Sequence, residues 1–428
     1  MRKFINLRNL GGVAFVFAFM WILGKIGVSF EFLNVFEKVF EDFELTDIYY
    51  SKIRDNSQEP FEDDIVLVNI GTLGRRDIAK QIQIISQCKP KVIAIDARFF
   101  YPKEEDPVGD FMLAQAFKEA GNVILGSEAA SYEHVEYSEE EAEKLTAWDT
   151  LLRPIPLFLQ YVQTGHVNTG MPDNEFSFLT WRDFPIVEKI KNGHVEPCLA
   201  AKVLENYDKK AYERLMARLD KKSDEDRKER IYFKGNLDKY VKLDVQDVLL
   251  KNFDSTLITG KIVLMGYLGS EYTDYHFDED KFYTPLNPKQ MGRGAPDMYG
   301  VVVHANIISM VLDDKFVNDM PATISWTVAL ILCYINVSLF TWIVTHPRYA
   351  IWYNAISKSI QLLEAISLYF INVFLFAKLN YQADLTVTIF VIVLSGDLAE
   401  IYVDVLLNFI RKIRSKLKPM EDKPVLNV

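Results

Sequence analysis

The chain of 428 residues has a formal net charge of −11, and 49% of its residues are hydrophobic. Three cysteines are too few for a disulfide-rich scaffold or a cysteine-based zinc site. The charge is segregated, because Glu31–Met320 holds 35 Lys and Arg against 52 Asp and Glu, whereas the two flanks hold 13 against 7. An acidic middle between basic, apolar flanks excludes a simple soluble enzyme and argues against a nucleic-acid binder, which needs a basic face.

The chain begins with a short basic segment and an apolar one. Residues 1–9 include Arg2, Lys3 and Arg8, and residues 10–30 are apolar except for Lys25. About 20 apolar residues suffice to cross a bilayer. No small-x-small cleavage site follows, so the segment predicts an uncleaved signal anchor rather than a removable signal peptide.

Three further apolar stretches near the C-terminus predict transmembrane helices, at residues 322–345, 360–379 and 385–410. Lys and Arg occur at the N-terminus, in the loop after the second span and in the tail 411–428, but not in the turn 380–384. The positive-inside rule then places both termini in the cytoplasm and residues 31–320 outside it. We expect these spans to be embedded in the lipid bilayer.

The middle region combines strand and helix signals. An alternating strand at 64–70, a helically spaced segment at 78–88 and a buried strand at 91–96 predict a β-α-β unit with parallel strands. Further elements are expected at 111–120 (helix), 122–125 (strand), 230–233 (strand), 245–252 (helix), 260–266 (strand) and 301–312 (helix). The predicted fold class is an α/β extracytoplasmic domain with a mixed sheet, plus four transmembrane α-helices.

Four ordered groups of motifs resemble one known family. They are the 64–71 strand with Val92-Ile-Ala-Ile-Asp96; Gly165-His-Val-Asn168 with Asp183-Phe-Pro-Ile; Gly260-Lys-Ile-Val-Leu-Met-Gly266 with Asp274 and Tyr283-Thr-Pro285; and Gly300-Val-Val-Val-His-Ala-Asn306. The set resembles the type-two CHASE sensory domain of bacterial transmembrane receptors, over roughly residues 40–315. The resemblance implies a sensor in the bacterial inner membrane with a periplasmic domain, and a homodimer as one arrangement.

The chain departs from that family's pattern in two places. Thr72–Asp77 stands where such domains often carry a tryptophan-proline motif. The receptors normally continue into a cytoplasmic catalytic domain, and the 18 residues from Arg411 to Val428 are too few for one. We therefore expect a sensory module without its own catalytic output.

Polar residues within the motifs are the candidate ligand-binding residues of the domain. They are Asp96, His166, Asn168, Asp274, Thr284, His304 and Asn306. Asp274 belongs to an acidic loop with His276, Asp278, Glu279 and Asp280, but no spacing there is diagnostic of a metal, and a solvated loop explains it as well. No nucleophile or metalloprotease motif is present, so we expect no enzyme activity, no cofactor and no metal. Cys88 and Cys198 are both expected outside the cytoplasm, where they form either a disulfide or two free thiols.

Carboxylates inside the predicted spans form a second candidate site. Asp397, Glu400 and Asp404 share one face of the last span, and Glu364 lies in the span before it. A carboxylate near the bilayer centre costs about 3 kcal/mol on insertion scales, so it should meet a partner. Because no Lys or Arg lies in the interior of a predicted span, we expect that partner to be a second polypeptide, a proton or another ion.

The sequence supports three hypotheses of function. The first is a membrane-anchored sensory or interaction module that signals through its transmembrane helices to a separate partner protein. The alternative is a structural or accessory subunit of a multiprotein bacterial envelope complex. The third, an extracytoplasmic hydrolase that uses the acidic loop, has little support, because Asp274 and His304 form no known catalytic spacing.

Overall fold

A computed structural model describes residues 6–26, 44–132, 147–169, 180–222, 227–269, 280–288, 295–409 and 412. The chain divides into two compact units, Glu41–Val317 and the combination of Met1–Phe40 with Asn318–Val428. The predicted site residue Asp274 and most of the basic tail lie outside the described residues.

The unit Glu41–Val317 is built around one sheet. Among the described residues, seven strands form it in the order β10-β1-β11-β2-β3-β4, with β5 also pairing with β3. Their bounds are β1 Glu62–Asn69, β2 Val92–Ile95, β3 Val123–Ala130, β4 Thr150–Leu152, β5 Val162–His166, β10 Tyr240–Leu243 and β11 Ile262–Gly266. β3 and β4 are antiparallel, whereas the other pairs in this sheet are parallel. The predicted α/β class with a mixed sheet is confirmed.

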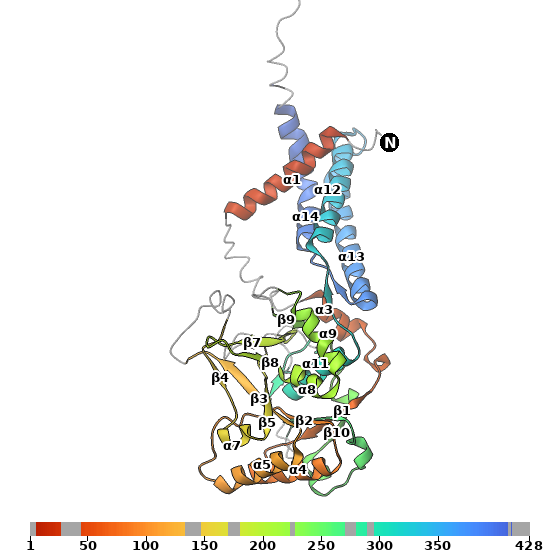
Figure 1. The fold of residues 1–428 in the computed structure, drawn as a ribbon. Helices are drawn as coiled ribbons and strands as arrows, with labels where there is room; N and C mark the ends of the chain where they lie inside the picture. The colour runs from red at the N-terminus through yellow and green to blue at the C-terminus, as the bar shows by residue number, and fades with distance from the viewer. Residues whose placement is uncertain are drawn as a thin grey trace, which may run out of the picture. The chain divides into compact units, whose positions relative to one another are not determined.

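Helices cover both faces of this sheet (Figure 1). One face carries α4 (Arg75–Gln87), α5 (Pro107–Ala120), α7 (Pro156–Leu159) and α10 (Val245–Leu249), and the other carries α8 (Leu199–Tyr207) and α11 (Gly300–Leu312). α9 (Lys209–Leu219) packs on α8 and α11. Apolar side chains that alternate along the strands pack against α4 and α5, where Phe117 is fully buried. The result is the three-layer arrangement expected of an α/β domain.

The structure corrects one expected element and decides two points that the sequence left open. β1 and β2 do not pair directly, because β11 inserts between them. The predicted strand at 230–233 is limited to β9 (Lys228–Arg230), which pairs with β6 (Asp183–Pro185) outside the main sheet. Cys88, Cys198 and Cys333 are all free thiols, which settles the open alternative against a disulfide.

Small elements complete this unit. They are α3 Leu45–Ile48, η1 Tyr49–Ile53, η2 Asn56–Gln58, β7 Val187–Lys189, β8 Val195–Pro197, η3 Leu237–Lys239, η4 Ser255–Leu257, β12 Lys281–Phe282 and β13 Met298–Tyr299. The pairs β7–β8 and β12–β13 are short antiparallel ladders. β12 and β13 bring the segment around Lys281 next to the start of α11.

The other unit is helical. Its helices are α1 Leu7–Ile26, α12 Ala322–Thr345, α13 Tyr353–Leu379 and α14 Thr386–Ile401, the last continuing as the π-helix η6 Tyr402–Leu407. η5 (Ala350–Trp352) precedes α13, and β14 (Asn318–Asp319) pairs with β15 (Tyr381–Gln382). α1 packs on α12 and α14 through Val13, Val16, Cys333 and Val391.

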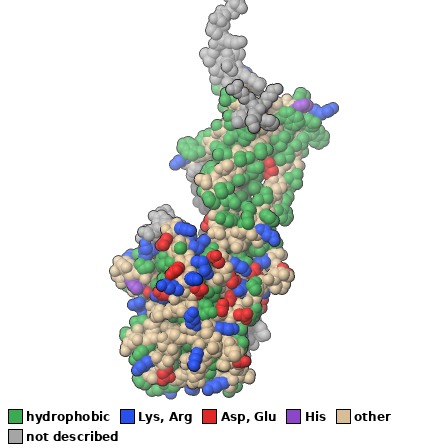
Figure 2. Space-filling view, turned by 45° about the vertical axis from the view of Figure 1, so that its right-hand side comes forward, with side chains coloured by type: hydrophobic (Ala, Val, Ile, Leu, Met, Phe, Trp, Pro, Cys, Tyr) green, Lys and Arg blue, Asp and Glu red, His purple; other side chains and the backbone are tan. Residues whose placement is uncertain are grey.

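Two helices of the described chain are long and apolar enough to cross a membrane, Ala322–Thr345 and Ala350–Leu379. The apolar part of α1, Leu7–Leu23, is shorter. Large apolar side chains such as Trp342, Leu363 and Phe370 are exposed on this unit. Figure 2 shows apolar side chains over the helical unit and charged ones gathered on the α/β unit. Exposed apolar surface of this extent indicates contact with lipid or with a partner.

Candidate functional site

Polar side chains gather where the parallel strands end. Asp96 follows β2, and His166 is the last residue of β5. Ligand sites of open α/β sheets commonly lie outside the carboxyl ends of the strands. Asp96 and His166 therefore lie at the edge of the sheet where such ligand sites occur.

Two glycines allow helices to begin directly on these strand ends. A Cβ atom at Gly165 would lie 2.8 Å from Leu199 Cα at the start of α8, and one at Gly266 would lie 2.7 Å from Val301 Cβ near the start of α11. Such distances exclude any side chain larger than hydrogen at both positions. The N-terminal ends of α8 and α11 are thereby brought to the strand ends that carry His166 and Asp96.

The start of α11 lies between two carboxyl groups. A Cβ atom placed on Gly300 would be 3.5 Å from Asp96 Oδ2 and 3.9 Å from Asp280 Oδ1. The backbone N–H of Gly300 donates to the Asp280 carbonyl at 3.2 Å. One turn further along α11, His304 Nε2 lies 3.9 Å from Asp96 Oδ2. We call Asp96, His166, Asp280, Gly300 and His304 the carboxyl-edge cluster.

The surroundings shift the pKa values of the acidic groups upward. Desolvation raises the pKa of Asp96 to about 6, against the opposing charge of Arg98. Partial desolvation and the charge of Asp96 raise the pKa of Asp280 to about 7, although that residue as a whole is exposed. Both carboxyl groups therefore change charge near neutral pH, which is common at functional sites.

The two histidines are buried and neutral. Burial lowers the pKa of His304 to about 4, and burial together with His304 and Arg227 lowers that of His166 to about 3. Both ring nitrogens of His166 and Nδ1 of His304 have no hydrogen-bond partner in the described structure. Buried polar atoms are nearly always satisfied, so each such atom needs an explanation.

Aromatic rings form one wall of the cluster. Trp181 stacks edge to face on Phe282, with ring centroids 4.8 Å apart, and on His304 at 6.0 Å. The Trp181 indole N–H donates to the Asp183 carbonyl at 2.9 Å, which fixes the ring. An apolar surface thus lies beside Gly300 and His304.

Other predicted ligand residues have structural roles. Asn168 hydrogen-bonds both backbone groups of Ala129, at 2.9 and 2.8 Å. Thr284 Oγ1 donates to Asp297 Oδ2 at 2.6 Å and fixes a turn. Asn306 is fully buried and bonds the backbone of Lys234 and Gly235. The structure therefore brings together only Asp96, His166 and His304 among the predicted ligand residues that it describes.

Sequence reasoning overlooked Trp181 and Phe282, named Gly300 only as part of a motif, and treated Asp280 only as part of an acidic loop. No pattern in the sequence connects Trp181, the segment 280–282 and Gly300. In the described part of the chain, no group of three or more His, Cys, Asp or Glu residues could hold a metal ion.

Two carboxylates of the helical unit, Asp397 and Glu364, have partners within the chain, and the sequence did not predict the intrachain cation of Asp397. Because α13 begins at Tyr353, Lys358 is helical, and its Nζ donates to both Asp397 carboxylate oxygens at 2.8 Å. Glu364 Oε2 accepts a 2.8 Å hydrogen bond from Asn336. Asp404 is exposed and Glu400 is partly buried.

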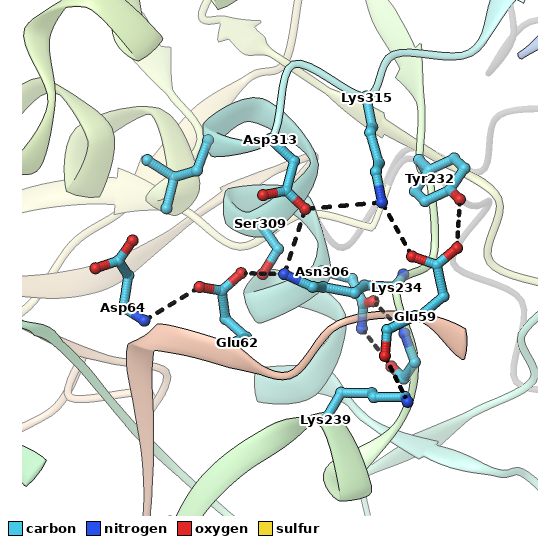
Figure 3. Close-up of polar contacts among 12 residues, drawn as sticks. Glu59, Glu62, Asp64, Tyr232, Lys234, Lys239, Asn306, Ser309, Asp313 and Lys315 are labelled. Carbon is cyan, nitrogen blue, oxygen red and sulfur yellow. Dashed lines mark hydrogen bonds and ion pairs between the residues drawn. The ribbon is translucent and has the colours of Figure 1, made fainter. Parts of the chain in front are cut away.

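Ion pairs join the end of α11 to the start of β1. Lys234 Nζ lies 2.7 Å from Glu62 Oε2 and 3.3 Å from Asp313 Oδ2. Lys315 Nζ lies 3.0 Å from Glu59 Oε2, and the Tyr232 hydroxyl donates to Glu59 Oε1 at 2.8 Å. Figure 3 shows these contacts around Asn306 and Ser309 of α11. We call Glu59, Glu62, Lys234, Asp313 and Lys315 the linker network, since Asp313 and Lys315 lie between α11 and α12.

The N-terminal end of the α/β unit is also fixed by an ion pair, through Asp47 of α3. Arg182 donates to both Asp47 carboxylate oxygens, at 3.1 and 2.6 Å, and both side chains are buried. A bidentate buried pair of this kind fixes the geometry of its two segments. Both ends of the α/β unit that continue toward the apolar helices are thus held by ion pairs.

Comparison with known proteins gives one family. The CHASE2 domain matches residues 62–345, from the first residue of β1 to the last of α12. No curated protein and no solved structure matches the chain. The CHASE2 domain is a sensory, extracytoplasmic domain, and the match covers most of the chain. The protein therefore belongs to the CHASE2 domain family, as the ordered motifs predict.

Proposed function

We propose that the protein is a membrane-anchored sensory module whose external domain detects a stimulus at the carboxyl-edge cluster. The signal passes along α11 and through the linker network to the transmembrane helices, and from them to a separate partner protein. Four membrane spans, both termini in the cytoplasm and a bacterial inner membrane are parts of this proposal. The positive-inside pattern and the family of the domain support them.

One observation carries the proposal: the single helix α11 connects the carboxyl-edge cluster with the linker network. α11 begins at Gly300 in the cluster, carries His304 one turn later, and ends immediately before Asp313 of the linker network. Twelve of its residues are buried, so a shift at one end is transmitted through packed side chains. The chain then continues through Lys315 to α12.

A signal along this route requires two arrangements of α11 whose balance the stimulus changes. Ionised Asp96 and Asp280 repel each other beside Gly300, whereas a compensated pair does not. The energy of that repulsion shifts the balance between the two arrangements of α11. Lys234 and Lys315 transfer a movement of α11 to β1 and to the segment that precedes it.

Replacing Asp96 with asparagine should slow amide hydrogen exchange at the start of α11 and in the linker 313–317. The substitution removes the repulsion and therefore stabilises one arrangement of the helix. Exchange is measured by mass spectrometry on the full chain in lipid nanodiscs at pH 8, above the pKa of Asp96.

Two further variants make this test specific. Asp63→Asn removes an exposed carboxylate near the opposite end of β1 and should change neither segment. Adding Lys315→Met to Asp96→Asn should preserve the effect on α11 but abolish it in the linker. Unchanged exchange at 313–317 in Asp96→Asn would contradict transmission through α11.

A second candidate function is that of a structural subunit in an envelope complex. The Lys358–Asp397 pair favours it, because these side chains are 52% and 55% exposed on the helical unit. A charged pair facing lipid is costly, so a covering protein would stabilise it. On this hypothesis Asp397→Leu abolishes co-purification of a constant partner from membranes in mild detergent. Exposed Asp384→Leu is the control, and an unchanged set of co-purified proteins in Asp397→Leu would eliminate this function.

A further inference from the structure

A cavity of about 590 Å³ lies in the α/β unit, at the opposite end of the main sheet from the carboxyl-edge cluster. We propose that it binds a small zwitterion of the amino acid class, with the ligand's ammonium group at Asp64 and its carboxylate at Lys91. No residue of the carboxyl-edge cluster lines this cavity, so the inference goes beyond the proposed function.

Six elements of the α/β unit surround the cavity. Asp64 lies near the start of β1, Lys91 immediately precedes β2, and Gly260 lies two residues before β11. These three strands are neighbours and run parallel, so the cavity is at their amino ends. The last residue of α8, the first residue of α9 and the end of α11 complete the lining.

Opposite charges line the cavity without pairing with one another. Three of the lining residues are acidic, Asp64, Asp208 and Asp313, and two are basic, Lys91 and Lys209. In the part of the chain that the structure describes, neither Asp64 nor Lys91 has an oppositely charged group within 4.0 Å. A molecule that carries both signs of charge can compensate both residues at once.

The side chain of Tyr207 keeps these two charges apart. Lys91 Nζ donates to the Tyr207 carbonyl and lies over the ring, 5.0 Å from its centroid. The Tyr207 hydroxyl donates to Asp64 Oδ1 at 2.8 Å. The cation is thus bonded to the backbone of one tyrosine and the anion to its hydroxyl, and a zwitterion that lies along the ring bridges them.

Both groups keep bonding capacity for a ligand. A lysine ammonium has three N–H donors, of which Lys91 uses one within the described chain. Asp64 Oδ2 accepts no hydrogen bond from the described residues. Both side chains belong to exposed residues, so a ligand reaches them from solvent. Burial, followed by the hydrogen bond and the charge of Asp64, raises the pKa of Tyr207, so the field at the hydroxyl end favours an ammonium group.

A ligand with one sign of charge matches the cavity less well. A cation at Asp64 leaves Lys91 without a counter-charge, and an anion at Lys91 leaves Asp64 without one. The acidic residues also do not converge on a metal, because no group of three His, Cys, Asp or Glu residues in the described chain could hold one. The charges therefore select a molecule with both an ammonium and a carboxylate group.

A bound zwitterion would act directly on the linker network. Asp313, a member of that network, also lines the cavity. The Asp64 N–H donates to Glu62 Oε1 at 3.1 Å, and Lys234 joins Glu62 to Asp313 (Figure 3). Occupation of the cavity should therefore slow amide hydrogen exchange in the linker 313–317.

Binding is measured by calorimetry on the full chain in lipid nanodiscs at neutral pH. The probe is L-alanine. L-alaninamide lacks the carboxylate, N-acetyl-L-alanine lacks the ammonium group, and potassium chloride controls for ionic strength. We expect saturable heat with L-alanine only, and slower exchange at 313–317 when L-alanine is bound.

Variants locate the site. Asp64→Asn keeps an acceptor for the Tyr207 hydroxyl but removes the charge, and Lys91→Met removes the opposite charge. Each should weaken L-alanine binding by about tenfold, as expected for one charge-assisted hydrogen bond. Lys91→Arg retains the charge and should bind L-alanine more tightly than Lys91→Met. Asp63→Asn removes the neighbouring exposed carboxylate, which does not line the cavity, and should bind as the wild type does. Circular dichroism confirms that each variant is folded.

Three results would overturn the inference: no saturable heat with L-alanine, equal heats for L-alanine and either blocked derivative, or equal affinity in Asp64→Asn and wild type. Unchanged exchange at 313–317 with L-alanine bound would contradict an action on the linker network. None of these results bears on the carboxyl-edge cluster, because the hydrogen-exchange experiment with Asp96→Asn uses no amino acid.

Discussion

Replacing Lys234 with methionine should destabilise the α/β unit by about 3–5 kcal/mol, the largest loss that we expect from one substitution. The Lys234 side chain is 5% exposed and lies between Glu62 and Asp313, and the Glu62 side chain is 6% exposed. Methionine has a similar length but no charge, so the Glu62 carboxylate would remain buried without a cation. Burial by itself lowers the pKa of Lys234. The hydrogen bond from Lys234 to Glu62 and the charge of Glu62 outweigh this effect, so that the pKa of Lys234 is raised overall.

The measurement is urea unfolding of the full chain in detergent, followed by tryptophan fluorescence. Lys315→Met is the matched control, because its side chain is 31% exposed and its loss should be about 1 kcal/mol. The double variant Lys234→Met with Glu62→Gln should recover part of the loss, since it removes the uncompensated charge as well. Equal losses in Lys234→Met and Lys315→Met would show that the linker network is not a buried ion-pair system.

Replacing Asp96 with asparagine should stabilise the same unit above pH 6, and the gain should vanish below about pH 4. The pKa of Asp96 is raised in the folded state to about 6, from an ordinary value of 3.8, so the folded state binds this proton more tightly. Ionisation of Asp96 consequently reduces stability as the pH rises through that window. Asparagine avoids this loss, and a shift of about two pKa units corresponds to at most about 3 kcal/mol.

The expected result is a set of unfolding free energies from pH 4 to pH 8, in which the variant and the wild type converge at the acidic end and separate with rising pH. Asp63→Asn, which replaces an exposed carboxylate, should remain parallel to the wild type over the whole range. A stabilisation that is independent of pH would mean that the introduced asparagine gains a new contact and that charge is not its cause.

The family and the fold class were accessible from sequence because both depend on local order. Alternating and uninterrupted apolar runs predict β1, β2 and β11, since a buried strand has few other solutions. The pairing of strands is different, because no local signal shows that β11 lies between β1 and β2. A strand distant in the sequence takes that position when its apolar residues complete both faces of the sheet.

The candidate site was predictable only in part. Asp96 and His304 belong to family motifs, and the sequence therefore singled them out. Asn306 and Thr284 belong to the same motifs, yet they hold turns and segments of backbone in place. Membership of a motif does not separate residues that bind a ligand from residues that support the fold, because the same polar residue types serve both roles.

The sequence by itself determined that an acidic α/β domain lies between basic, apolar segments, since hydropathy and charge are sums over neighbouring residues. Only the tertiary structure decided which polar groups meet. It brings Asp96, Asp280 and His304 together at the start of α11, and it gives Asp397 a partner in Lys358. The contacts at the start of α11 depend on the close approach of α8 and α11 to Gly165 and Gly266, which is a property of packing and not of any one segment.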